Sequence, residues 1–262
     1  TDGDIEAAID WLREKGLAQA AKKAGRIAAE GAVVQYITEC GKVGAVVEVN
    51  CETDFVAKTD NFINFSKNVA KHVAMANPAD IDELMNQKFV DDETKTIEDM
   101  ISDATVAIGE KISIRRFARY ETTGLVSSYI HMGGKVGVLL QVETGKADTA
   151  AAEAFQTMCK DITLHIAACA PKSVDSSSLD PAFVAEEQEI AKAQLIAEGK
   201  PEHLLEKILP GKLKALYKQS CLMSQEFVKD PSMSVEALVA ATGKALGDTI
   251  TVKAFERFQL GA

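Results

Sequence analysis

The sequence predicts an α+β fold of two related subdomains, each a three-stranded antiparallel sheet with helices on one face, plus an inserted antiparallel helical hairpin. The first observation is an internal repeat, because residues 41–49 (GKVGAVVEV) recur as residues 134–142 (GKVGVLLQV), an offset of 93. The second is a helical pattern that follows both copies. The third is the similarity of residues 111–120 to residues 249–258, which predicts a closing strand in each unit.

The chain begins with two predicted helices. Ile5, Ala8, Ile9 and Leu12 fall on one face of the first helix, and the Ala- and Lys-rich residues 17–30 predict the second. We therefore expect the repeated part of the chain to begin at about residue 31.

Each copy of the repeat predicts a β-hairpin followed by a helix. In the first copy, residues 33–38 and 43–49 are rich in β-branched side chains and flank a short Gly-Lys turn. The helix that follows ends before Pro78, and its apolar face recurs position by position in the second copy. The matched pairs are Phe62 with Phe155, Phe65 with Met158, Val69 with Ile162, His72 with His165 and Val73 with Ile166.

The second copy carries extra sequence before its closing strand. Phe183, Ile190 and Ala197 fall seven residues apart, and a second apolar stripe follows the Gly-Lys-Pro turn at 199–201. That stripe consists of Leu205, Ile208, Leu209, Leu213 and Leu216. Two amphipathic helices joined by a tight turn predict an antiparallel hairpin, and Pro210 is expected to break or kink its second arm.

Composition excludes several classes of function. With 29 basic and 39 acidic side chains the net charge is −10, so nucleic acid, which requires a cationic face, is not an expected partner. No apolar run approaches the roughly 20 residues of a membrane span, and the sequence shows no apolar secretory leader. The five cysteines are an odd number without a Cys-x-x-Cys pair, which predicts reduced thiols in a reducing compartment.

The sequence offers no catalytic constellation, so we expect neither an enzyme nor a cofactor or metal of its own. No nucleophile lies beside a base, and no Gly-rich loop of the nucleotide-binding kinds is present. His72 and His165 could be core residues or ligands of a shared metal, but Cys159 and Cys169 do not supply a convincing ligand set. We therefore interpret both histidines as core or boundary residues.

Residues 50–58 (NCETDFVAK) depart from the repeat. The matching residues 143–146 of the second copy are Glu-Thr-Gly-Lys, with no aromatic side chain. Phe55 thus falls between a strand and a helix, at a place where the sister unit has no ring. Two interpretations are open: Phe55 as a hydrophobic staple with Asp54 as a helix cap, or Phe55 as an aromatic wedge presented to a partner.

The chain resembles the elongation factor Ts family of bacterial type, the guanine-nucleotide exchange factors of elongation factor Tu. Residues 48–58 (EVNCETDFVAK) carry the most specific match. The similarity extends from Gly3 to the end of the chain, and the duplicated subdomains and inserted hairpin are also what the family implies. Further matches are AAKKAGR at 20–26, AAEG at 28–31, IGEKI at 108–112, IRR at 114–116 and SYIH at 128–131.

The resemblance implies a surface that binds elongation factor Tu. Phe55 is expected to enter an apolar cleft between two helices of the partner's GTPase domain, beside Asp54, and to disturb the groups that hold Mg²⁺ and the nucleotide phosphates. Lys229, next to Val228, departs from the apolar residue that the family can carry there. The implied binding residues are Thr53, Asp54, Phe55, Val56, Ile108, Gly109, His131 and Val228.

The implied function is to dock on elongation factor Tu, in its GDP-bound and nucleotide-free forms, and to accelerate GDP release so that GTP rebinds. We expect a cytoplasmic protein, with the mitochondrial matrix as the alternative, that binds neither nucleic acid nor membrane. A homodimer through the hairpin is left open. The alternative function is a non-catalytic scaffold or assembly protein that binds partners through the helical hairpin.

The resemblance also suggests how the chain is divided into domains. The family begins with a small three-helix domain, of which only the last helix, around residues 4–15, is expected here. The predicted parts are 1–30 as the remnant of that domain with a linker helix, 31–121 as core subdomain N, 122–179 and 219–262 as core subdomain C, and 180–218 as the inserted coiled-coil hairpin.

Overall fold

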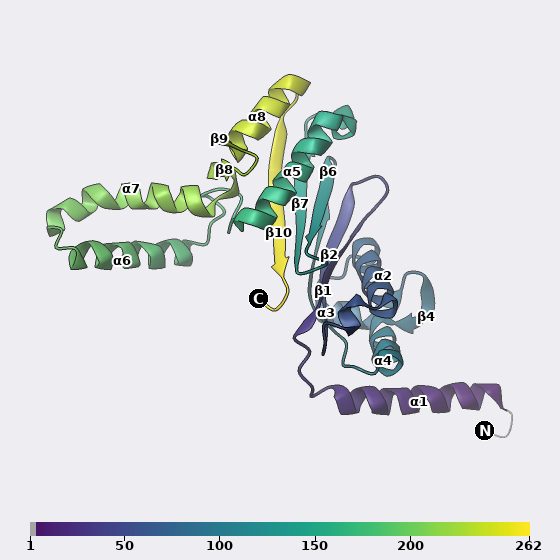
Figure 1. The fold of residues 1–262 in the computed structure, drawn as a ribbon. Helices are drawn as coiled ribbons and strands as arrows, with labels where there is room; N and C mark the ends of the chain where they lie inside the picture. Colours follow the sequence, from purple (N-terminus) through teal and green to yellow (C-terminus); the bar gives the residue numbers. More distant parts are fainter. Residues whose placement is uncertain (1–3) are drawn as a thin grey trace. The chain divides into compact units, whose positions relative to one another are not determined.

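The computed structural model describes residues 4–262, apart from the side chains of residues 5, 6, 8–10, 12, 13, 17, 202 and 203. By its internal contacts the chain forms two compact units, one up to Leu139 together with Glu256–Ala262, the other Leu140–Phe255. Figure 1 shows helices and strands in both. The predicted α+β class is confirmed, because the chain contains two separate three-stranded sheets.

The first sheet has the strand order β1-β2-β5, with β1 at Glu30–Ile37, β2 at Val43–Cys51 and β5 at Ser113–Glu121. Both pairs of neighbours are antiparallel, and β1 runs along β2 from Glu30 opposite Cys51 to Ile37 opposite Gly44. β-branched residues are frequent in β2, and all of the strand after Val43 is buried. The hairpin and the closing strand predicted for the first copy are confirmed.

Three helices lie beside this sheet in the first unit: α2 (Asp60–Ala76), α3 (Ile81–Asn86) and α4 (Ile97–Ile108). A short hairpin of β3 (Lys88–Phe89) and β4 (Asp92–Thr96) precedes α4. Figure 1 shows α2, α3 and α4 on the same side of β1 and β2. The predicted arrangement, helices over one face of an antiparallel sheet, is therefore present.

The limits of α2 follow from its sequence. The Thr59 side chain caps the helix by accepting a hydrogen bond from the Phe62 amide. Asn77 ends it in the left-handed conformation, with φ of 51°, just before Pro78. The prediction that this helix ends before the proline is confirmed.

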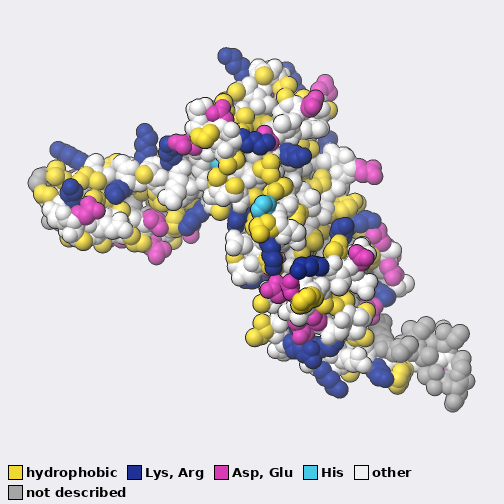
Figure 2. Space-filling view, in the orientation of Figure 1, with side chains coloured by type: hydrophobic (Ala, Val, Ile, Leu, Met, Phe, Trp, Pro, Cys, Tyr) yellow, Lys and Arg dark blue, Asp and Glu magenta, His cyan; other side chains and the backbone are white. Residues whose placement is uncertain are grey.

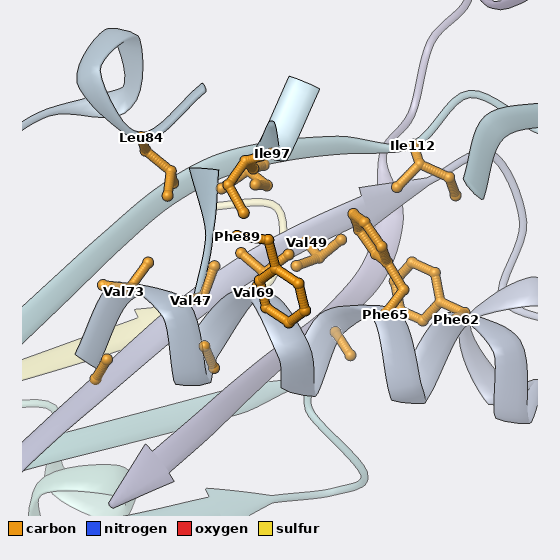
Figure 3. Packing of buried hydrophobic residues seen from close by; sticks show 14 of the residues in the cluster. Val47, Val49, Phe62, Phe65, Val69, Val73, Leu84, Phe89, Ile97 and Ile112 are labelled. Carbon is orange, nitrogen blue, oxygen red and sulfur yellow. The ribbon is translucent and has the colours of Figure 1, made fainter. Parts of the chain in front are cut away.

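The core of the first unit lies between α2 and the sheet. Phe62, Val69 and Val73 are fully buried on the predicted helix face, and they meet Val47 and Val49 of β2 (Figure 3). The other face of the sheet carries a smaller cluster. Its buried members are Val33, Val46, Val126, Leu139 and Phe258.

The second sheet has the order β10-β7-β6, with β6 at Leu125–His131, β7 at Val136–Thr144 and β10 at Ile250–Gln259. Its helices are α5 (Glu153–Cys169) and α8 (Val235–Leu246). The α5 face predicted from the repeat is buried, which confirms it. Its buried members include Phe155, Met158, Ile162, His165 and Ile166.

The repeat continues beyond Pro171 at a new offset. Gln87 precedes the β3–β4 hairpin, and Gln225 precedes the matching hairpin of β8 (Glu226–Phe227) and β9 (Asp230–Ser234), an offset of 138 instead of 93. The second copy is therefore 45 residues longer between these points (138 − 93). Two short 3₁₀ turns, η2 and η3, complete this copy at Ala147–Ala151 and Leu222–Ser224.

The extra residues form the predicted helical hairpin, with α6 at Pro181–Ala197 and α7 at Glu202–Ser220. Figure 1 shows these helices side by side and antiparallel. The residues between them include Gly199, whose φ is 74°. Of the break or kink expected at Pro210, the break is wrong, because α7 continues through this residue as one helix. Proline removes a single N–H donor, and the turns on both sides keep their own hydrogen bonds. Within residues 4–262, no helix is long and apolar enough to cross a membrane.

The N-terminal segment differs from the prediction of two helices. A single helix, α1 (Ile5–Lys23), runs through Gly16, and the chain is already in β1 at Glu30. A glycine inside a helix costs only about 1 kcal/mol, so it does not by itself end one. Pairing of Glu30 with Cys51 overrides the helical propensity of the Ala-rich residues before it. The side chains of the predicted stripe Ile5, Ala8, Ile9 and Leu12 lie outside the described part.

Candidate partner-binding surface

The Phe55 loop, residues 52–58, begins where β2 ends and passes through the 3₁₀ turn η1 (Val56–Lys58) to the Thr59 cap of α2. The Phe55 side chain is 79% exposed. A staple would bury this ring against the helix, and the helix cap is supplied by Thr59 instead of Asp54. The staple-and-cap interpretation is therefore wrong, and the ring is available to a partner.

The backbone around Phe55 is held by its neighbours although the ring itself is exposed. The Cys51 thiol donates a hydrogen bond to the Thr53 carbonyl, with 3.1 Å between sulfur and oxygen. The Ala57 amide donates to the same carbonyl at 3.4 Å. Val56 and Ala57 pack against the core of the first unit. The loop thus presents its one aromatic residue outward from an anchored turn.

Asp54 and Lys58 form an ion pair on this loop, with 2.7 Å between Lys58 Nζ and a carboxylate oxygen. The hydrogen bond from Lys58 lowers the pKa of Asp54, so the carboxylate is ionised at neutral pH. The Lys58 Nζ also lies 6.0 Å from the centroid of the Phe55 ring. The exposed ring therefore stands beside a paired acid and base.

Ile108 and Gly109 lie next to the Phe55 loop. Ile108 ends α4 and packs partly against the core, while Gly109 caps the helix in the left-handed region with φ of 89°. The next residue, Glu110, accepts a hydrogen bond from the Thr53 amide at 2.9 Å. The structure therefore brings the predicted residues Thr53–Val56 and Ile108–Gly109 together on the first unit.

Two acidic residues at this surface, Glu52 and Glu110, were not predicted. The Glu52 carboxylate accepts a hydrogen bond from the Lys111 amide at 2.7 Å and pairs with Arg26 at 3.3 Å. These two contacts, the amide first, lower the pKa of Glu52. Both acids lie inside the matched motifs 48–58 and 108–112, but their partners are mainly backbone amides about 58 residues away. Sequence position alone does not reveal such bonds.

His131 lies at the end of β6, in the first unit, on a separate turn from the Phe55 loop. Its side chain is exposed, and its Nδ1 lies 3.0 Å from the Tyr129 hydroxyl. The following residue, Met132, is 72% exposed and has φ of 49°. The turn thus presents a histidine and an apolar side chain to solvent.

Val228 lies in the second unit, on the turn between β8 and β9, and is 45% exposed. Its amide donates a hydrogen bond to Nδ1 of the buried His165 at 3.1 Å. Because Nδ1 accepts, the ring proton resides on Nε2 and is donated to Gln225 Oε1 at 2.8 Å. The buried histidine therefore positions the backbone of a predicted binding residue.

No three His, Cys, Asp or Glu side chains of the described residues come together as a group that could hold a metal ion. His72 and His165 are fully buried and bonded to Gln87 and Gln225, as expected for core residues. Figure 2 shows basic and acidic side chains intermixed over the face in view. The geometry around Phe55 presents an exposed aromatic ring next to the Asp54–Lys58 ion pair.

The sequence is similar to known proteins over nearly its whole length. Residues 52–262 match the family described as Elongation factor TS. A protein named Elongation factor Ts from Trichlorobacter lovleyi is 45% identical over 261 residues, which are 99% of this chain and 84% of that protein. Proteins of the same name from Halothermothrix orenii and Clostridium kluyveri are each 42% identical, over 100% and 99% of this chain and 84% of their own lengths.

Proposed function

Because this chain belongs to the elongation factor Ts family, we propose that it docks on elongation factor Tu and accelerates the release of GDP, so that GTP can rebind. The observation that carries this proposal is the Phe55 ring, 79% exposed on an anchored turn. An exposed aromatic side chain gains free energy when it enters a desolvated pocket, which is why aromatic residues dominate binding hot spots.

Phe55 acts as a wedge in this mechanism. The ring enters an apolar cleft between two helices of the GTPase domain, and the ionised Asp54 accompanies it. The displaced helices carry the groups that hold Mg²⁺ and the nucleotide phosphates, so nucleotide affinity falls. By linkage, the factor binds nucleotide-free elongation factor Tu more tightly than the GDP-bound form, by the same factor.

The energetics require several contacts. Burying one phenylalanine contributes about 1.5–3 kcal/mol. A ten-thousandfold acceleration of release requires about 5.5 kcal/mol of differential stabilisation of its transition state. Phe55 therefore supplies part of the effect, and the remaining contacts share the rest. We assign these to Thr53, Asp54, Val56, Ile108, Gly109, His131 and Val228.

The proposed setting is the bacterial cytoplasm, where the partner supplies both the nucleotide and Mg²⁺. The relatives named above are bacterial proteins, which gives the mitochondrial alternative no support. The chain needs no cofactor for this function, since it performs no bond-forming chemistry and changes only the affinity of its partner. The exposed Ile190 and Ile196 of α6 are the positions through which a homodimer would form.

The test is the rate of GDP release from elongation factor Tu loaded with a fluorescent GDP, followed by stopped flow. Phe55→Ala is expected to slow factor-stimulated release about five- to fiftyfold. This corresponds to losing most of the free energy that burial of one phenylalanine ring contributes. Met75→Ala is the matched control, because Met75 is a 55% exposed apolar side chain of α2 away from the Phe55 loop. Wild-type release by Phe55→Ala would refute the wedge.

A further inference from the structure

The Glu110 carboxylate is bonded to the backbone of the Phe55 loop from outside it. One oxygen accepts hydrogen bonds from the Glu52 amide at 3.0 Å and the Thr53 amide at 2.9 Å. The other accepts a hydrogen bond from the Thr53 hydroxyl at 2.7 Å. We call these three bonds the Glu110 bracket. A carboxylate that accepts several such bonds is a strong and directional anchor for a loop.

Glu52 makes the reverse connection. Its carboxylate accepts from the Lys111 amide at 2.7 Å, so each segment donates backbone N–H groups to an acid of the other. The Lys111 ammonium in turn donates to the carbonyls of Ala24 at 2.6 Å and Arg26 at 3.1 Å. The Phe55 loop is therefore tied to the end of α4 and to the segment that follows α1.

The second copy of the repeat contains a related but smaller set of bonds, the sister bracket, without the wedge. Asp248 stands 138 residues after Glu110, the offset of this part of the repeat. Its carboxylate accepts hydrogen bonds from the Lys146 amide at 3.0 Å and from the Thr149 hydroxyl. Lys146 corresponds to Thr53, but Gly145 stands where the first copy has Glu52, so the second copy has no reverse connection. An acid that holds the loop is thus part of both copies.

From this geometry we propose that Glu110 is a positioning residue for nucleotide exchange, which fixes Thr53 and thereby the direction in which Phe55 is presented. The inference depends on the proposed wedge. Because the Phe55 ring is exposed, packing of the ring itself does not orient it. Its orientation must come from the backbone, and the bracket supplies hydrogen bonds to the two residues just before Asp54. A loop already ordered in its binding conformation loses less freedom on binding.

The experiment uses Glu110→Gln, which keeps the shape of the side chain but removes its charge, so that the two amides donate to a neutral oxygen and lose the extra strength of a bond to a carboxylate. At saturating factor, the variant is expected to release fluorescent GDP from elongation factor Tu roughly three- to tenfold more slowly, the range expected for ordering one loop segment. Asp248→Asn is the matched control in the sister bracket and is expected to release at the wild-type rate. Unchanged release by Glu110→Gln would overturn the proposal.

A double-mutant cycle separates positioning from a general loss of structure. If Glu110 acts through the ring, Glu110→Gln slows exchange in the wild-type background but has little further effect in Phe55→Ala. An equal slowing in both backgrounds would overturn the proposal while leaving the wedge intact. A wild-type rate for Phe55→Ala alone would overturn the wedge and this inference together.

Hydrogen exchange of the free protein gives a readout that is independent of activity. The Glu52 and Thr53 amides are expected to exchange faster in Glu110→Gln, while the Lys146 amide exchanges faster in Asp248→Asn only. Thr53→Val, which removes one bond of the bracket, is the milder variant if Glu110→Gln folds poorly. Thr53→Val is expected to speed hydrogen exchange of the loop amides and to slow GDP release, each by a smaller factor than Glu110→Gln. Unaltered protection of the two amides in both variants would contradict the bracket.

Discussion

The two buried histidines perform the same task in both copies of the repeat. His72 accepts a hydrogen bond at Nδ1 from the Val90 amide at 3.3 Å, and its Nε2 lies 2.9 Å from Gln87 Oε1. His165 makes the corresponding contacts with Val228 and Gln225. Each ring thereby fastens a short hairpin to a long helix. The neutral tautomer with its proton on Nε2 is the form that satisfies both bonds.

This arrangement predicts a loss of stability in mild acid. Burial lowers the pKa of His72 and His165, and the hydrogen bond to glutamine opposes this only in part. Below the unfolded pKa of about 6.5, the unfolded chain binds protons that the folded protein does not. The free energy of unfolding therefore decreases as the pH is lowered. Each ring adds a slope of up to about 1.4 kcal/mol per pH unit.

The measurement is urea unfolding between pH 8 and pH 5 for the wild type and for a double variant, His72→Gln with His165→Gln. The double variant is expected to be less stable at pH 8 but to lose less stability on acidification, because neither glutamine titrates. Parallel curves for the two proteins would show that the buried histidines are not the source of the acid sensitivity.

At the scale of elements, α7 shows how packing and helix length outweigh one unfavourable residue. Pro210 and Gly211 adjoin in the middle of this helix, yet it runs from Glu202 to Ser220. The buried Leu195 and Leu205 anchor the end of the hairpin near its turn. The helix therefore tolerates a pair that intrinsic propensity disfavours.

Replacing these two residues is expected to stabilise the hairpin. Pro210→Ala restores an N–H donor and gains up to about 3 kcal/mol of helix propensity, and Gly211→Ala gains about 1 kcal/mol. A Cβ atom at Gly211 meets no other atom within 4 Å, so no clash offsets the gain. Hydrogen exchange of the α7 amides measures both effects, because a more stable helix exchanges more slowly. A smaller increase in protection for Pro210→Ala than for Gly211→Ala would contradict this ranking.

Sequence patterns predicted the repeated elements because burial imposes them. The spacing of Phe62, Val69 and Val73 reports the buried face of α2 directly. The patterns failed at residues 24–30, since an Ala-rich segment favours helix while the pairing of Glu30 with Cys51 is a contact distant in sequence. Such pairing leaves no local signal.

The candidate site was also predictable only in part. The aromatic residue Phe55 was found because the sister copy lacks it, but a staple and a wedge share one sequence pattern, and only its 79% exposure separates them. Glu110 was missed because two of its three bonds come from the amides of Glu52 and Thr53, which carry no side-chain signature, and because its partners lie more than 50 residues away in the sequence. A comparison with Asp248 at the second offset is the signal that would have found it.

For the whole molecule, the change of offset from 93 to 138 describes one fold with an insertion in its second copy. The two ends of the insertion meet: the Lys172 amide donates to the Ser220 carbonyl at 2.8 Å, and the Leu222 amide donates to the Ser173 carbonyl at 2.9 Å. The hairpin is therefore entered and left at one place. The first copy closes the same gap with α3 and needs no hairpin.

The hairpin is consequently expected to be dispensable for folding and for the wedge. Replacing residues 176–218 by a short Gly-Ser linker keeps the bonds of Lys172 and Ser173 to the chain beyond it, so the two sheets should form as before. Circular dichroism should show the loss of helix with a cooperative unfolding transition retained. Stopped-flow GDP release at saturating factor should keep most of the wild-type rate, because Phe55 and Glu110 belong to the first unit. A protein that bound its partner through the hairpin would instead lose all stimulation together with all detectable binding of elongation factor Tu, and that result would restore the scaffold interpretation.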